Sequence, residues 1–88
     1  MTLYVYSYYK KKGGFYTQPV LNNFDNEEIV QLSQRAFLMN KGSQEHEEQK
    51  ECDLYALGTF DDVKGQFILN EKTVFLCSFV EVGEEDGK

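Results

Sequence analysis

The first residues of the chain alternate between two kinds of side chain, which is typical of a β-strand. Across residues 2–9, Leu3 and Val5 fall on one side of an extended chain, and three tyrosines fall on the other: Tyr4, Tyr6 and Tyr8. Three lysines and two glycines follow, and glycine accepts the backbone angles of a tight turn. We expect residues 15–18 to return as a short strand, which Pro19 ends or places at a sheet edge.

A capping box begins the one helix that the pattern predicts, over about residues 26–40. Asp25 can accept hydrogen bonds from the first turn while Glu28 reaches back, and Phe24 and Ile29 flank the pair as a hydrophobic staple. Within the helix an apolar stripe recurs at three- and four-residue spacing: Ile29, Val30, Leu32, Ala36, Phe37 and Met39. The stripe predicts a helix that covers a sheet, with three polar residues facing out: Gln31, Gln34 and Arg35.

The second half of the chain predicts more strands. Residues 42–51 are polar and aperiodic, so we expect an exposed loop there. Residues 53–60 are apolar on both sides, as in a central strand, and a turn at 61–65 leads to a returning strand at 66–69. A second turn at 70–72 precedes a long strand at 73–82. The predicted fold is α+β, with one helix on a small, mostly antiparallel sheet of four or five strands in the order β-β-α-β-β-β.

Composition limits the chain to one core. It has 88 residues, 41% of them hydrophobic and 15% aromatic, so we expect a single domain over residues 1–83 and a disordered acidic tail over 84–88. Its longest apolar run, residues 74–82, is far shorter than the roughly 20 residues of a membrane helix, and signal-peptide features are missing. We expect a cytoplasmic protein with no membrane partner, in which Cys52 and Cys77 are buried free thiols.

Candidate catalytic chemistry is sparse. The only histidine, His46, lies in the predicted loop beside Glu45, Glu47 and Glu48, and a flexible set of this kind is not a preorganised metal site. Neither cysteine has a neighbouring base, and no glycine-rich phosphate-binding motif is present. We therefore expect no enzymatic activity, no cofactor and no metal.

The charge of the chain is uneven. The formal net charge is −6, which disfavours passive adhesion to nucleic acid. Residues 1–41, however, carry five cations and three acids, a net of +2, whereas residues 42–88 carry four cations and twelve acids, a net of −8. The N-terminal part can therefore approach a phosphate backbone that the rest repels.

Two binding hypotheses follow from this asymmetry. In the first, three tyrosines stack on the bases of single-stranded nucleic acid and four cations contact phosphates: Tyr4, Tyr6, Tyr8, Lys10, Lys11, Lys12 and Arg35. The alternative reading of the same tyrosines is a place in the core beneath the helix. In the second hypothesis, an acidic surface binds a basic groove of a host protein that handles nucleic acid, through Glu45, Glu47, Glu48 and Glu51. A homodimer through an exposed sheet edge is a third alternative.

The segment from Asp53 to Asp61, followed by Gly65, resembles the small nonstructural protein of microviruses, especially the gokushovirus branch of single-stranded DNA phages. In that family an acidic residue, three apolar or aromatic positions, a glycine, a further aromatic residue and a second acid recur at this spacing before a turn glycine. Three further matches carry the resemblance: Tyr4-Val5-Tyr6 as opening strand, Pro19, and Arg35-Ala36-Phe37 in the helix. The chain departs from the family at residues 49–52, where a His-Pro pair is common, and at the lysine and glycine run of residues 10–14.

This resemblance implies a phage early protein without enzymatic activity, located in the host cytoplasm. It further implies DNA binding that favours single-strand genome production and packaging over duplex replication. The residues themselves neither require nor forbid DNA as the ligand.

Overall fold

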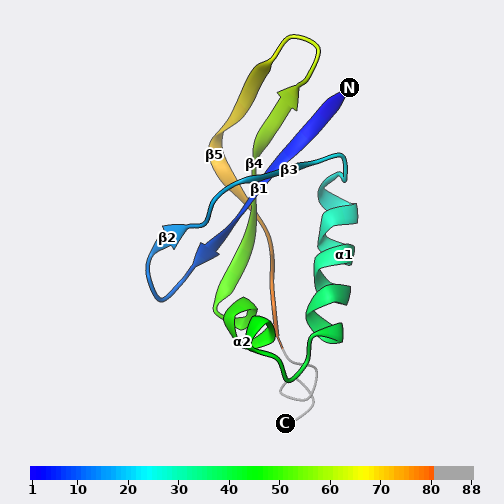
Figure 1. Cartoon of the computed structure of the whole chain (residues 1–88). Coiled ribbons are helices and arrows are strands. Elements are labelled where there is room, and N and C mark those ends of the chain that lie inside the picture. The colour runs from blue at the N-terminus through cyan, green and yellow to red at the C-terminus, as the bar shows by residue number, and fades with distance from the viewer. Residues whose placement is uncertain (81–88) are drawn as a thin grey trace.

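The computed structural model describes residues 1–80 of the chain (Figure 1). Five strands and two helices follow one another in this part: β1 (Thr2–Lys10), β2 (Phe15–Tyr16), β3 (Val20–Asn22), α1 (Asn26–Met39), α2 (Gln44–Lys50), β4 (Cys52–Asp61) and β5 (Gln66–Ser78). The predicted α+β class is confirmed, although the element order differs. The expected acidic tail lies outside the described residues.

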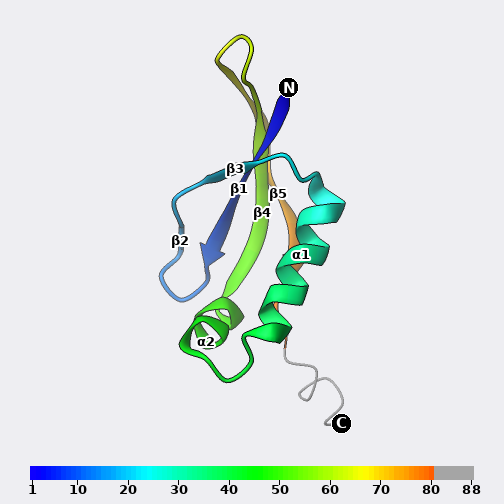
Figure 2. The ribbon, with the colours of Figure 1, turned by 45° about the vertical axis from the view of Figure 1, so that its right-hand side comes forward.

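All strand pairs of the sheet are antiparallel, and β1 lies in the middle. On one side of β1, strand β2 pairs with the end of β1 and strand β3 pairs with the first half of β1. On the other side, β4 pairs with β1, and β5 pairs with β4. Helix α1 runs along one side of the sheet and α2 lies across its lower end, whereas β2 lies on the side away from α1 (Figures 1 and 2). One face of the sheet is therefore covered by helices and the other is not.

The predicted three-stranded meander is wrong. Residues 66–78 form one continuous strand, β5, and the expected turn at 70–72 is a bulge within it. Ala56 pairs with Val74 and Gly58 pairs with Leu69, so a single residue of β4 faces four residues of β5. Turn-forming residues are accommodated here because a bulge allows extra residues without reversing the chain. Strand β3, after Pro19, was not predicted.

A glycine is required where this bulge begins. Gly58 has a φ of 156°, and a Cβ at this position would overlap the backbone oxygen of Ile68. The two strands can approach closely here only because no side chain lies between them.

Helix α1 begins with the predicted capping box: the Asp25 carboxylate accepts from the Glu28 amide, and the Glu28 side chain accepts from the Asp25 amide. Its inward side differs from the predicted stripe. Ser33 and Phe37 are buried and Ile29 and Val30 are half-buried, while three residues of the predicted stripe are exposed: Leu32, Ala36 and Met39. Gln34, expected to face out, instead donates from Nε2 to the backbone oxygen of Ser78.

The predicted loop at residues 42–51 is wrong for most of its length, because residues 44–50 form α2. Ser43 caps this helix by accepting from the His46 amide. His46 is 1% exposed, its ring stacks on Phe37 with centroids 4.0 Å apart, and its Nδ1 lies 2.9 Å from the Phe37 backbone oxygen. A seven-residue helix has little stability of its own, so tertiary packing around this ring stabilises it, a feature that hydrophobic periodicity cannot reveal.

The core lies between the covered face of the sheet and the two helices. It is built from five buried residues: Tyr6, Phe37, Leu54, Ala56 and Phe79. Both cysteines are free, as predicted; Cys52 is buried and Cys77 is half-buried. Burial raises the pKa of both thiols, so neither is an activated nucleophile.

Candidate functional site

The three tyrosines predicted to stack on bases lie on the face of β1 that α1 covers. Tyr6 is only 3% exposed, and its hydroxyl donates to the Phe24 backbone oxygen. Tyr4 stacks along Tyr6, and Tyr8 packs on Phe79, with ring centroids 6.4 and 6.0 Å apart. The expected open strip is therefore absent: Tyr6 is a core residue, and Tyr4 and Tyr8 are half-buried against the same core.

Burial also decides the acid–base behaviour of Tyr6. Loss of hydration raises the pKa of its phenol to about 12, and the neighbouring Asp25 carboxylate adds to the effect. The ring is thus a neutral, hydrogen-bonded part of the core rather than a surface available to a ligand.

The structure separates the predicted phosphate contacts. Lys10 pairs with Cys52 in the ladder and therefore lies on the covered face. The ammonium groups of the next two lysines are next to carboxylates: Lys11 is 3.7 Å from Asp53, and Lys12 is 3.9 Å from Glu51. Arg35 lies on α1 and lines a shallow hollow with four other residues: Phe24, Glu28, Gln31 and Leu32. The four cations do not form one patch.

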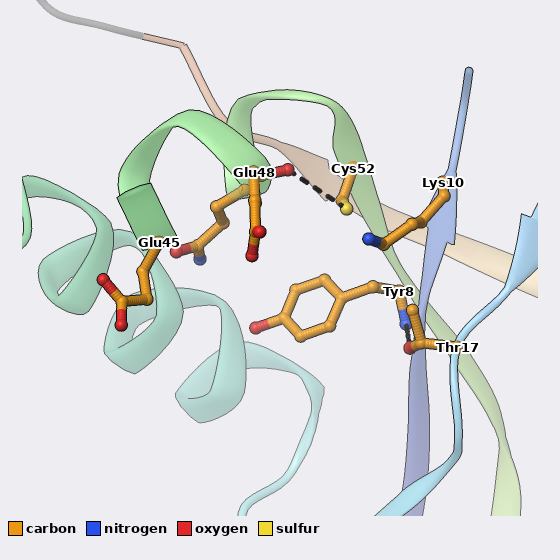
Figure 3. Close-up of a pocket in the computed structure, with 7 residues that line it drawn as sticks. Tyr8, Lys10, Thr17, Glu45, Glu48 and Cys52 are labelled. Atoms are coloured by element: carbon orange, nitrogen blue, oxygen red, sulfur yellow. Dashed lines mark hydrogen bonds between the residues drawn. The ribbon is translucent and has the colours of Figure 1, made fainter. Parts of the chain in front are cut away.

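Lys10 lines a pocket of about 210 Å³ between β1 and α2. Figure 3 shows the Tyr8 ring extending across this pocket, with the Lys10 ammonium and the Cys52 thiol above it. Thr17 forms one wall, and its Oγ1 accepts from the Tyr8 amide. Glu45 and Glu48 approach from α2, so the pocket is small and bordered by two acids.

The opposite face of the sheet carries an aromatic cluster that the sequence did not single out. It contains four rings from four strands: Tyr9, Tyr16, Tyr55 and Phe75, which we call the aromatic face. Tyr9 pairs directly with Tyr16, and Tyr55 pairs directly with Phe75. Because directly paired residues point to the same side of an antiparallel sheet, the register places all four rings away from α1.

The rings of the aromatic face contact one another and remain accessible. Tyr9 and Tyr16 have centroids 4.9 Å apart, Tyr16 and Tyr55 5.5 Å, and Tyr55 and Phe75 5.7 Å. Tyr16 reaches across the sheet to β5, where its hydroxyl lies 3.1 Å from the Thr73 hydroxyl. Tyr16 is 43% exposed and Phe75 is 53% exposed, so about half of the surface of each residue is open to a ligand.

One signal in the sequence could have revealed this cluster. A hairpin through the lysine and glycine turn, as predicted, brings Tyr9 close to Tyr16. The alternation of Tyr4, Tyr6 and Tyr8 instead predicted a stacking surface on the other side of the same strand. Cations lie near the aromatic face as well, because Lys11 contacts Asp53, the ladder partner of Tyr9.

The four glutamates of the alternative hypothesis lie on α2 and at its end. Glu45, Glu47 and Glu48 are exposed around the buried His46, while Glu51 is half-buried beside Lys12. Glu47 lies 3.6 Å from Lys50, one turn along the helix. The acids thus stand on an ordered helix rather than in a flexible loop.

The chain matches the model of the phage ORF5 protein family over residues 3–82. The chain belongs to this family. No curated protein and no solved structure matches the chain. The resemblance to a phage protein is therefore confirmed at the level of the family, and the matched residues of this family member include both helices and the strands described within residues 1–80, apart from Thr2 at the start of β1.

Two further observations bear on what this phage protein can do. No helix within residues 1–80 is long and apolar enough to cross a membrane. Within the same residues, no three potential metal-ligating side chains come together. His46 in particular is stacked in the core, so the acidic residues around it do not share it as a ligand.

Proposed function

We propose that this phage protein is a non-enzymatic binding protein for single-stranded nucleic acid, and that the aromatic face is its contact surface. One observation carries the proposal: four contacting rings lie on the sheet face that the helices leave open. The proposal moves the predicted site from one side of β1 to the other.

Stacking is the interaction that such a surface offers. A base stacked on an aromatic side chain contributes about 1–3 kcal/mol, with little dependence on the base. Tyr16 and Phe75 present the most open rings of the cluster, and Tyr55 lies between them. A duplex keeps its bases stacked within the helix, so these rings favour a single strand over a duplex.

Phosphate contacts are expected to be few. The side chains of Lys11 and Lys12 are 49% and 82% exposed, and their carboxylate partners lie at 3.7 and 3.9 Å. The Lys12–Glu51 pair is exposed, and such pairs contribute about 0–1 kcal/mol, so a phosphate can replace the Glu51 carboxylate at small cost. Asp53 is only 15% exposed but keeps the Ser78 hydroxyl as a donor when Lys11 turns to a phosphate. Because the chain has a net charge of −6, we expect modest affinity that falls as salt rises.

The resemblance of residues 53–65 to the microvirus nonstructural protein supports a more specific role. We propose that the protein acts during production or packaging of a single-stranded phage genome. Membership of the phage ORF5 family is consistent with this role.

Fluorescence anisotropy with a labelled oligothymidine tests the proposed activity. We expect salt-dependent binding, weaker binding to a duplex of the same length, and a roughly 5- to 150-fold loss in Tyr16→Leu, the equivalent of about 1–3 kcal/mol. Phe24→Leu is the matched control, since Phe24 is similarly exposed, at 39%, but belongs to the segment before α1. No binding by the wild-type protein at low salt, or an equal loss in both variants, would contradict the proposal.

A second candidate function rests on α2. Its exposed glutamates, Glu45, Glu47 and Glu48, are held on an ordered helix, which suits docking to a basic groove of a host protein. A variant with all three changed to lysine should lose a basic host protein that the wild type retains in a pull-down, while binding of oligothymidine is kept or strengthened. If capture is unchanged, the acidic helix is not the docking surface.

A further inference from the structure

Strand β5 has an open outer edge with apolar side chains. Every residue from Gln66 to Phe75 is exposed, although the whole segment is in the sheet. Five of these ten residues are apolar, with exposed fractions between 44% and 65%: Phe67, Ile68, Leu69, Val74 and Phe75. A long apolar edge strand with unpaired backbone groups is a template for pairing with another strand.

The rest of the sheet does not offer such an edge. At the other side of the sheet, β2 and β3 have only two and three residues, and Pro19 lies between them. Near the end of β5, the Gln34 side chain of α1 donates to the Ser78 backbone oxygen and occupies the edge there. Figures 1 and 2 show the remaining part of β5 at the rim of the sheet, beside β4 only. Residues 66–75 are therefore the open edge, which is extended on both sides of the bulge at residues 70–73.

We propose that this edge binds a second copy of the chain, so that two β5 strands pair antiparallel about a two-fold axis. An antiparallel pair of identical strands satisfies the edge groups of both copies with one self-complementary contact. Because residues 66–75 are the only long open edge in the part of the sheet that the structure describes, the contact closes into a dimer and does not extend further.

The distribution of charge favours contact between two copies along residues 66–75 over contact through other parts of the surface. The chain carries a net charge of −6, so most contacts between two copies bring acids together. Residues 66–75 contain one acid and one base, Glu71 and Lys72, and are neutral. They also adjoin Lys64 in the hairpin loop. Two copies can meet along this strand without the repulsion that the rest of the surface imposes.

The available area is sufficient for a stable contact. With the exposed fractions above, the four apolar side chains outside the aromatic face present on the order of 400 Å² in each copy, since an aromatic side chain alone has about 150–250 Å². Two copies thus offer about 800 Å² of apolar surface, and the paired backbone edges bring the contact close to the lower limit for specific interfaces. This proposal does not depend on nucleic-acid binding.

Sedimentation of the full chain at increasing concentration tests the dimer. We expect a mass that rises from 10.2 kDa to about twice that value and no further. Ile68→Lys and Leu69→Lys should each shift the protein to monomer by placing like charges across the two-fold axis. Met39→Lys is the matched control, because Met39 is an equally open apolar residue, 78% exposed, on α1.

Hydrogen exchange on the unmodified protein tests the dimer without substitutions, and therefore does not depend on whether the variants fold. In the dimer, amides within residues 66–75 should exchange more slowly as concentration rises, whereas amides of β2 and β3 should not change. A monomer at every concentration, growth beyond a dimer, or an equal effect of Met39→Lys would overturn the proposal. Dimerisation without oligothymidine binding would leave this proposal intact and refute the proposed function alone.

Discussion

The two faces of the sheet use the same residue type in opposite ways. On the covered face, Tyr6 is 3% exposed and its hydroxyl bonds to the chain that leads into α1. On the aromatic face, Tyr16 is 43% exposed and contacts other rings. The comparison teaches that tyrosine content alone does not locate a stacking surface; the position of the helices decides which rings become core and which stay available.

The largest expected difference between the two faces is in stability. Phe37 on the covered side is fully buried between His46 and Phe79, so Phe37→Ala should lower the free energy of unfolding by about 3–5 kcal/mol. Phe75→Ala on the open face should cost about 1 kcal/mol or less, because the ring is already 53% exposed. Urea denaturation of both variants checks this. Equal losses would mean that the aromatic face is a second core.

The next expected effect is on ligand binding, where a substitution on the aromatic face should matter more than one on the covered face. Phe75→Ala should weaken binding of oligothymidine by about 1–3 kcal/mol, because one stacking ring is lost. Tyr4→Leu, on the covered face, should leave binding unchanged. Anisotropy titrations at one fixed salt concentration measure both. A larger loss in Tyr4→Leu would return the site to the face that the alternating tyrosines first indicated.

A smaller expected effect on stability tests whether Tyr6 is a core residue. Tyr6→Phe removes the hydrogen bond to the Phe24 backbone oxygen and should cost about 1 kcal/mol near neutral pH. The pKa of Tyr6 is raised from 10.0 to about 12 in the folded protein, so its contribution is complete below pH 10. Between pH 10 and 12 the unfolded chain releases the proton first, and the contribution is lost as the pH rises.

Denaturation curves of the wild type and Tyr6→Phe across this range measure that contribution. The stability difference between the two proteins should shrink from pH 10 to pH 12. A constant difference would show that the Tyr6 phenol is not held neutral by the fold.

The smallest expected effect concerns the two lysines beside the aromatic face. If Lys11 and Lys12 each contact a phosphate, changing both to alanine should reduce the slope of log affinity against log salt by about 1.4. Asp53→Asn frees Lys11 from its carboxylate partner and should strengthen binding slightly. Lys41→Ala, at the far end of α1, is the control for total charge. An equal change in the control would mean that only net charge matters.

Much of the fold followed from local patterns in the sequence. The capping box at Asp25 and Glu28, the first hairpin and the α+β class were predicted because short-range chemistry specifies them. The inward side of α1 was predicted only in part: Ile29, Val30 and Phe37 of the predicted stripe pack on the core, whereas other apolar residues of the same stripe are exposed because the small sheet cannot cover them. Helix α2 was missed because its stability comes from the contact between His46 and Phe37, which is tertiary.

The candidate site was predicted only in part. The sequence indicated tyrosines near lysines on β1, but periodicity cannot tell which side of a strand receives a helix. Tyr55 and Phe75 come from strands whose register depends on bulges, so their position beside Tyr16 could not be read from spacing. The aromatic face results from the order and register of the strands, which bring together rings that are far apart in the sequence.

The central claim is that the face opposite α1 is the ligand-binding face. Two-dimensional NMR of the tyrosine ring resonances during titration with oligothymidine tests this most directly. We expect the signals of Tyr9, Tyr16 and Tyr55 to shift together while that of Tyr6 stays in place. Shifts confined to Tyr4 and Tyr8, or no shift of any ring at low salt, would contradict the account.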